Sequence, residues 1–120
     1  MNKVILLGRL TRDPEISKPK EENTQAVARY TLAVNRLLGN GGKEEVDYFN
    51  CVAFGARADF AENYLKKGMR VIINGRLHSS TYTNKDGQKQ YSVDVIVDEL
   101  YFAETRRNDN TDRKVQGGAE

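Results

Sequence analysis

Apolar residues recur along five stretches of the chain in patterns that are typical of β-strands. These stretches are residues 3–10, 25–36, 46–54, 69–83 and 90–102. Because strand side chains point alternately to the two faces of a sheet, a stretch in which apolar and polar residues alternate can bury one face and expose the other. The last two flank residues 84–89, in which Asp86-Gly87 is a strong signal for a hairpin turn. We therefore expect five strands, the last two of which form a long β-hairpin.

The apolar spacing changes to that of a helix between the third and fourth of these stretches. We expect a short helix over residues 57–67, with an inward face formed by Phe60, Ala61, Tyr64 and Leu65. Gly68 is expected to end this helix, and Lys66 and Lys67 suit the negative end of its dipole. Such an order of elements indicates an all-β protein with one short helix, built as the five-stranded Greek-key barrel called the OB-fold. A five-stranded sheet packed on the helix in another topology is the alternative.

The parity of the apolar residues assigns the inward side of each strand. The expected inward residues are Ala28, Tyr30, Leu32 and Val34 in the second stretch, Val71, Ile73 and Leu77 in the fourth, and Tyr91, Val93, Val95 and Val97 in the fifth. The first stretch differs because it is apolar on both sides. A small domain can cover one of those sides with its own core, so the other needs a partner, and a second copy of the chain is the simplest one. The expected oligomer interface comprises Val4, Ile5, Leu6, Leu7 and Phe49. For Phe49, burial in the core is the alternative.

The chain of 120 residues has the size of one domain, which we expect over residues 1–103. Residues 11–24 are polar and contain both prolines, which predicts a loop, and a glycine-rich break occupies residues 39–42. Residues 104–120 contain almost no apolar side chains, so we expect a disordered tail. The apolar run near the N-terminus is too short for a signal peptide or a membrane span, which favours a protein of the cytoplasm.

Composition and charge narrow the chemistry that the chain can carry. A formal net charge of +2 and an isoelectric point of 8.7 argue against a polybasic arm, so any nucleic-acid site must come from local charge. Cys51 is the single cysteine, which excludes an intrachain disulfide and predicts a buried strand thiol. His78 has no carboxylate or cysteine at metal spacing. No cluster of residues has catalytic spacing, so we expect neither an enzyme nor a metal or cofactor site.

Rings and basic groups are interleaved along the third and fourth stretches. Tyr48 and Phe54 share one parity, while Arg70 and Arg76 oppose the apolar side of their strand. Tyr82 borders the polar hairpin turn and has no core pattern to join. Nucleobases stack on exposed rings while guanidinium groups neutralise phosphates, a combination typical of single-stranded nucleic-acid binding. The alternative, from the residues alone, is that Tyr48 and Phe54 fill the core.

Several motifs, in order along the chain, resemble those of the bacterial single-stranded DNA-binding proteins. They are Asn2-Lys3-Val4-Ile5-Leu6-Leu7-Gly8-Arg9-Leu10, Asp13-Pro14-Glu15, Tyr30-Thr31-Leu32-Ala33-Val34-Asn35, Tyr64-Leu65-Lys66-Lys67-Gly68, and Tyr82-Thr83 ahead of Asp86-Gly87. The resemblance extends from Met1 to about Ala103. It implies an OB-fold homotetramer at the cytoplasmic nucleoid that wraps single-stranded DNA with little sequence preference during DNA replication, repair and recombination. The alternative is an OB-fold module for protein interaction or primosome assembly with weak nucleic-acid binding.

Position by position, the resemblance implies stacking rings at Tyr48, Phe54 and Tyr82. Tyr48 and Tyr82 stand where many members have tryptophan, and Leu38 stands where another ring often lies. Because the chain contains no tryptophan and tyrosine has a smaller ring, we expect retained binding with less stacking energy per site. The nucleic-acid-binding candidates are Tyr48, Phe54, Tyr82, Arg70, Arg76, Asn50, Lys3, Arg9, Arg29, Arg36, Lys67 and Lys85.

The C-terminal tail departs from the family pattern. Members often end in an acidic run with a terminal aromatic residue that docks replication and repair enzymes. Residues 104–120 instead balance four basic side chains against four acidic ones and end in Gly-Gly-Ala-Glu. Either the chain is truncated or this member lacks the docking tip, so we expect DNA binding without tail-mediated recruitment of replication proteins.

Overall fold

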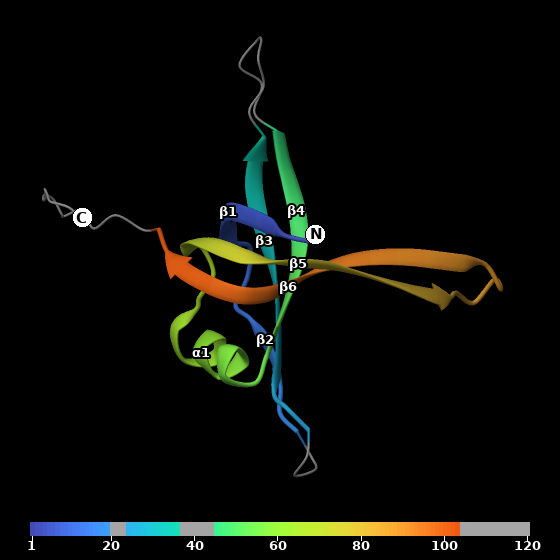
Figure 1. The fold of residues 1–120 in the computed structure, drawn as a ribbon, viewed down its shortest axis with the longest axis horizontal. Helices are drawn as coiled ribbons and strands as arrows, with labels where there is room; N and C mark the ends of the chain where they lie inside the picture. Colours follow the sequence, from blue (N-terminus) through green and yellow to red (C-terminus); the bar gives the residue numbers. More distant parts are fainter. Residues whose placement is uncertain (20–23, 37–44, 104–120) are drawn as a thin grey trace, which may run out of the picture.

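The computed structural model describes residues 1–19, 24–36 and 45–103 of the chain. Its elements are β1 (Val4–Leu10), β2 (Glu15–Ser17), β3 (Val27–Arg36), β4 (Glu45–Phe54), α1 (Ala56–Tyr64), β5 (Arg70–Thr83) and β6 (Lys89–Phe102) (Figure 1). The five predicted strands correspond to β1, β3, β4, β5 and β6. The predicted break at residues 39–42, the position of Leu38 and the predicted tail all lie outside the described residues.

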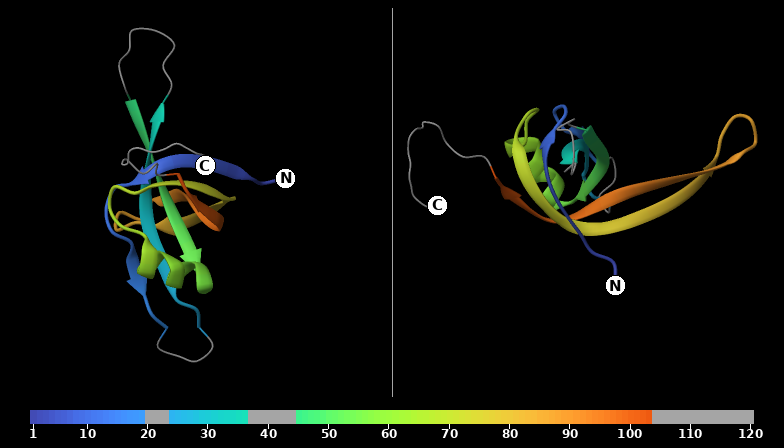
Figure 2. Two further views of the ribbon diagram at one scale, coloured as in Figure 1. Left: turned by 90° about the vertical axis from the view of Figure 1, so that its left-hand side faces the viewer. Right: turned by 90° about the horizontal axis from the view of Figure 1, so that it is seen from above.

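Five of the strands close into a barrel. β1 pairs with β5 from Val4↔Gly75 to Arg9↔Arg70, and its last two residues pair with β3. β3 pairs with β4, β4 with β6 and β6 with β5, which completes the ring of strands. Only the β4–β6 contact among these pairings is parallel, and α1, between β4 and β5 in the chain, packs against one end of the barrel (Figures 1 and 2). The predicted OB-fold is therefore confirmed, and the alternative topology is excluded.

The core fills the barrel and follows the predicted parity of the central strand segments. The buried residues at the predicted inward positions are Ala28, Tyr30 and Leu32 of β3, Val71 and Ile73 of β5, and Val95 and Val97 of β6. Val34 is partly buried and packs against this cluster. Cys51 is buried as predicted, and its burial raises the pKa of the thiol to about 12.

The prediction of a loop throughout residues 11–24 is wrong at β2. Glu15–Ser17 forms a three-residue strand that pairs with Val27–Arg29 of β3. A segment this short has too few alternating positions to reveal a strand in the sequence. Its backbone hydrogen bonds depend on the edge that β3 presents to it, which is a tertiary contact.

The helix is shorter than the sequence predicts. α1 ends at Tyr64, and Leu65 already has an extended backbone conformation. Gly68 instead makes the tight turn into β5, with φ at 88°, and its N–H donates to the Leu10 carbonyl at 2.8 Å. Lys66 and Lys67 consequently follow the helix and do not lie in its last turn. Tyr64 was expected in the core but is 56% exposed, because it lies at the end of the helix and covers Phe60 from outside, with ring centroids 4.8 Å apart.

The long β5–β6 hairpin extends beyond the barrel as a projecting arm, here defined as residues 77–93 (Figure 1). The prediction that Leu77, Tyr91 and Val93 face the core is wrong, because these side chains are 45%, 72% and 55% exposed. Pairing of β5 with β1 stops at Val4↔Gly75, so no described strand lies beneath the arm. Leu77, Tyr91 and Val93 share the parity of the buried residues of their strands, but they lie beyond the end of the barrel and so have no core to enter.

Candidate nucleic-acid interface

The register of the sheet places the three predicted rings on one outer side. Cys51 of β4 pairs with Val95 of β6, and both side chains are buried. The alternate residues of both strands therefore point outward, which includes Tyr48 and Phe54. On the arm, Tyr82 of β5 pairs with Gln90 of β6, which has the outward parity. The strand register thus carries Tyr82 to the same outer side of the sheet as Tyr48 and Phe54, whose shared side also follows from their parity within β4.

The three rings are accessible to a ligand. Tyr48 is 66% exposed, Tyr82 56% and Phe54 38%, so neither Tyr48 nor Phe54 fills the core, and that alternative is wrong. Tyr48 and Phe54 are six positions apart in β4, or roughly 20 Å along an extended strand. At this separation one base cannot contact both rings.

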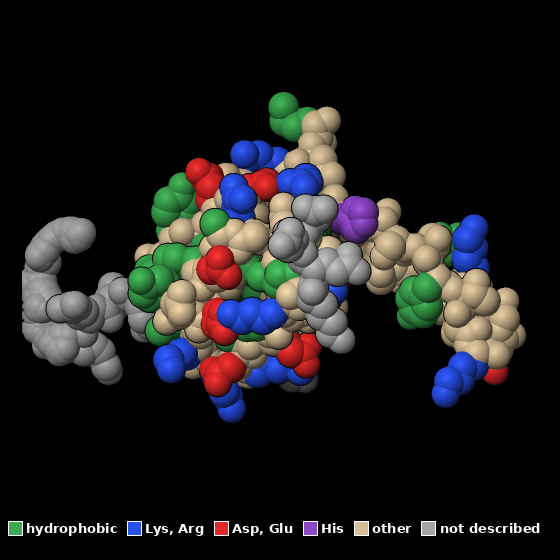
Figure 3. Space-filling view, turned by 90° about the horizontal axis from the view of Figure 1, so that it is seen from below, with side chains coloured by type: hydrophobic (Ala, Val, Ile, Leu, Met, Phe, Trp, Pro, Cys, Tyr) green, Lys and Arg blue, Asp and Glu red, His purple; other side chains and the backbone are tan. Residues whose placement is uncertain are grey.

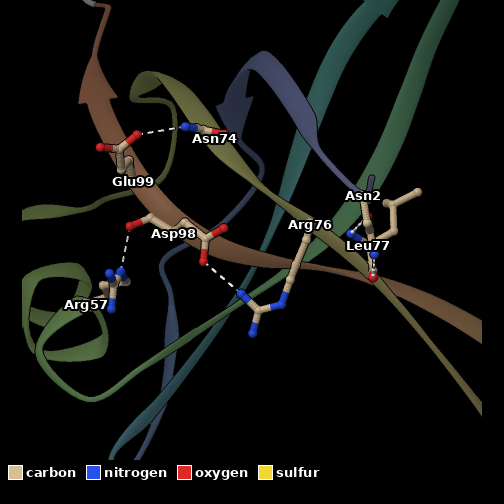
Figure 4. Close-up of polar contacts among 7 residues, drawn as sticks. All are labelled: Asn2, Arg57, Asn74, Arg76, Leu77, Asp98 and Glu99. Atoms are coloured by element: carbon tan, nitrogen blue, oxygen red, sulfur yellow. Dashed lines mark hydrogen bonds and ion pairs between the residues drawn. The ribbon is translucent and has the colours of Figure 1, made fainter.

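Three further predicted residues share this outer side. Asn50 lies between Tyr48 and Phe54 on β4, and Arg29 lies beside it on β3, opposite Val52. Arg76 has the same parity at the base of the arm, where it forms an ion pair with Asp98 at 2.8 Å (Figure 4). The name ring face is used below for the surface formed by Arg29, Tyr48, Asn50, Phe54, Arg76 and Tyr82.

Other predicted basic residues lie outside the ring face. Arg9 and Arg70 form a cross-strand pair on β1 and β5, and Lys3 is exposed just ahead of β1. Lys67 is exposed in the turn after α1, where its backbone N–H donates to the Asp13 carboxylate at 2.7 Å. Lys85 lies in the turn at the tip of the arm.

Arg36 lies at the end of β3 and is held by two carboxylates. It contacts Glu45 and Asp47 of β4, each at 2.5 Å, and this pairing lowers the pKa of Asp47 and raises that of Arg36. Its parity is opposite to that of Tyr48, so it does not belong to the ring face. The twelve predicted residues are thus spread over several surfaces, and only half of them form the ring face.

A hydrogen-bonded frame holds the base of the arm (Figure 4). The side-chain amide of Asn2 donates to the Leu77 carbonyl at 2.8 Å and accepts from the Leu77 N–H at 2.9 Å. Asn2 precedes β1, and its side chain continues the contact between β1 and β5 beyond their last backbone pair, Val4↔Gly75. These contacts fix the direction in which the arm carries Tyr82 away from the barrel.

The ring face contains a hollow that the sequence did not reveal. It has a volume of about 230 Å³ and is lined by polar and charged side chains, among them Arg12, Glu15, Arg29, Thr31, Asn50 and Asp94. Arg12 and Asp94 were not among the predicted residues. Arg12 lies in a segment without a strand pattern, and Asp94 is one of several polar residues on the solvent-facing side of its strand. Neither residue therefore had a sequence feature that indicated a binding role.

Charge on the described surface is mixed. Seen from below, acidic and basic side chains are interspersed, and hydrophobic ones gather on the side of the barrel away from the arm (Figure 3). Within the described ranges, no group of three or more histidine, cysteine, aspartate or glutamate residues could hold a metal ion. No helix in the described part of the chain is long and apolar enough to cross a membrane.

Comparisons with known proteins agree with this fold. The single-stranded DNA-binding protein of Bacillus cereus is 41% identical over 114 residues, covering 94% of this chain and 66% of the relative. Single-stranded DNA-binding protein 1 of Staphylococcus aureus is 41% identical, covering 92% of this chain and 70% of the relative. The chain thus spans about two thirds of the length of these curated relatives. A solved structure described as the Plasmodium falciparum SSB complex with ssDNA matches with a TM-score of 0.76 and 27% identity, over 87% of this chain and 96% of that one. Because the sequence model of the Single-strand binding protein family matches residues 1–103, this chain belongs to that family.

Proposed function

We propose that the protein binds single-stranded DNA on the ring face, by stacking bases on its three rings and pairing phosphates with its basic side chains. The observation that carries this proposal is the common outer side of Tyr48, Phe54 and Tyr82, with Arg29 and Arg76 beside them. The names of the relatives and of the solved complex support the same ligand. The protein would act by binding and not by catalysis.

The ion pair of Arg76 is compatible with phosphate binding. Both members of the Arg76–Asp98 pair are about half exposed, at 54% and 43%. Exposed pairs of this kind contribute roughly 0–1 kcal/mol, so exchanging the carboxylate for a phosphate costs little. Lys85 at the tip of the arm would extend the same track past Tyr82. The arm would then follow the strand beyond the barrel.

We also propose that the protein works as a homo-oligomer, most simply the tetramer that the family resemblance implies. Of the predicted interface residues, Val4, Leu6 and Phe49 pack against the protein's own core, whereas Ile5 is 67% and Leu7 42% exposed. Within the described ranges, β1 pairs with β3 only through Arg9 and Leu10, so one edge of its first half has no strand beside it. An open edge with exposed apolar side chains is a template for another chain.

A buried acceptor on the same surface supports this assembly. Asn74 pairs with Ile5 across β1 and β5, and its amide nitrogen donates to Glu99 at 2.7 Å (Figure 4). Its Oδ1 atom is buried without a hydrogen-bond partner among the described residues. Buried acceptors are normally satisfied, and a donor from a second copy would complete this one.

In the cell, this activity would keep exposed single strands unpaired and protected during replication, repair and recombination at the nucleoid. The alternative of a protein-interaction module with weak DNA binding would not require rings exposed on one side beside guanidinium groups. The exposure of Tyr48 and Tyr82 therefore favours the DNA-binding function.

The test is a titration with oligo-dT, oligo-U and duplex DNA at two salt concentrations, followed by tyrosine fluorescence. We expect tight binding to oligo-dT that weakens at the higher salt, because neutralised phosphates release counterions. Duplex DNA should bind much more weakly, since its bases cannot reach the rings. Equal weak binding to all three ligands would overturn the proposal.

A further inference from the structure

The hollow on the ring face lies between two stacking positions. Along β4, Asn50 lies between Tyr48 and Phe54, and the wall of the hollow beside it comes from β3 and from Asp94 of β6. Arg12, from the segment after β1, completes the lining. A strand that stacked on both rings would run along the part of β4 that borders this hollow. A base between the two stacked ones would then lie at its opening.

The charges of the lining do not favour a phosphate. Two guanidinium groups, from Arg12 and Arg29, are balanced by two carboxylates, from Glu15 and Asp94. A phosphate would be attracted by the first pair and repelled by the second. A neutral group that both donates and accepts hydrogen bonds would satisfy both pairs at once.

The polar groups of the lining retain hydrogen-bonding capacity. Within the described ranges, none of the four charged residues of the hollow forms an ion pair. Thr31 donates to Asn50 Oδ1 at 3.2 Å, which leaves the amide donors of Asn50 available. A nucleobase has complementary edges, and bases of single strands are read on those edges by such side chains.

Among the bases, guanine matches this donor and acceptor set best. Its N1–H and N2 amino group are two adjacent donors, which suit a carboxylate, while its O6 and N7 are two adjacent acceptors, which suit a guanidinium group. Thymine offers a single N–H donor and so leaves a carboxylate poorly satisfied. We propose that the hollow lined by Arg12, Arg29, Asn50 and Asp94 binds one guanine of the bound strand, so that this one position has a base preference while the rings hold the rest of the strand with little regard to sequence. This inference rests on the proposed function, because it assumes that single-stranded DNA occupies the ring face.

The experiment uses the full chain and short oligo-dT strands that differ at one central position. That position carries dT, dG, dC or dA, and two further strands carry hypoxanthine, which lacks the N2 amino group, or 7-deazaguanine, which lacks N7. Competition against a labelled oligo-dT strand measures relative affinity. We expect the dG strand to bind on the order of tenfold more tightly than the dT strand. Hypoxanthine and 7-deazaguanine should each lose most of that gain.

Two variants test the residues, and a third is the matched control. Asp94→Asn and Arg29→Gln should each lower the dG-to-dT ratio of affinities toward one. Asp59→Asn removes an exposed carboxylate from α1, away from the hollow, and should leave the ratio unchanged. The ratio is the readout because Asp94→Asn also removes a negative charge near the DNA, which by itself would strengthen binding to every strand equally.

The outcomes separate this inference from the proposed function. Binding to oligo-dT with equal affinity for the dG strand overturns the guanine site and leaves DNA binding intact. An Asp94→Asn variant that binds all strands more tightly with an unchanged ratio also overturns it, because the carboxylate then acts only by repulsion. Failure to bind any single strand overturns the proposed function itself.

Discussion

The outward apolar residues of β1 allow a quantitative prediction about assembly. The double substitution Ile5→Ser and Leu7→Ser should dissociate the homo-oligomer without unfolding the subunit. Their side chains are 67% and 42% exposed in the single chain, so together they offer about one whole large apolar side chain for burial. Burying one such side chain contributes about 1.5–3 kcal/mol. A two-fold interface uses each residue twice, which gives roughly 3–6 kcal/mol per pair of subunits.

Because each 1.4 kcal/mol is a factor of ten, the dissociation constant should rise between about a hundredfold and ten-thousandfold. Analytical ultracentrifugation over a range of protein concentrations measures this change. Leu77→Ser with Val93→Ser is the matched control, since it removes similarly exposed apolar residues from the arm. It should leave the assembly unchanged. The reasoning would be refuted by a β1 variant that keeps the wild-type dissociation constant while its circular dichroism spectrum shows an intact barrel.

Three further predictions concern the arm, the barrel and the core. Tyr82→Ala should weaken binding to oligo-dT by about 1–3 kcal/mol, measured by fluorescence titration, whereas Tyr91→Ala, on the opposite side of the arm, should have little effect. Gly75→Ala should lower the free energy of unfolding by at least about 1–3 kcal/mol in thermal denaturation, since the added Cβ would lie 2.1 Å from the Ile96 carbonyl oxygen; a wild-type melting temperature would contradict this. Cys51 should be inert to a thiol reagent at pH 8 in the native state and reactive once unfolded, because burial raises the pKa of its thiol to about 12. The raised pKa also contributes to the free energy of unfolding. This contribution is complete below the ordinary thiol pKa of about 8.5, and it is lost as the pH rises from there toward about 12.

Locating the ring face required both the parity of residues within one strand and the register between strands. The rings themselves could be predicted, because Tyr48 and Phe54 share a parity within β4 and parity is a local property of a strand. That Tyr82 shares their side could not be derived from its own strand. It depends on the parallel contact of Cys51 with Val95 and on the hairpin register, which relate residues far apart in the chain.

The errors in the prediction have a common physical cause. Leu77 and Val93 have the alternation of core residues, but the barrel ends where β1 stops pairing with β5, so they are exposed on the arm. Tyr64 fits a helical apolar face, yet the helix ends there and the ring covers Phe60 from outside. In each case the local pattern was correct, and the extent of the neighbouring element determined burial.

Sequence alone was sufficient for the five long strands, the presence of the helix, the inward parity within the barrel and the family, because these follow from short-range periodicity and from motifs in order along the chain. It was also sufficient to exclude a polybasic arm and a multi-cysteine site. Tertiary structure alone decided that Arg36 is neutralised by two carboxylates, that Asn74 has a buried acceptor without a described partner, and that Arg29 and Asp94 line one hollow. Those properties arise from strand pairing across the barrel, where the distance between two side chains bears no relation to their separation in the sequence.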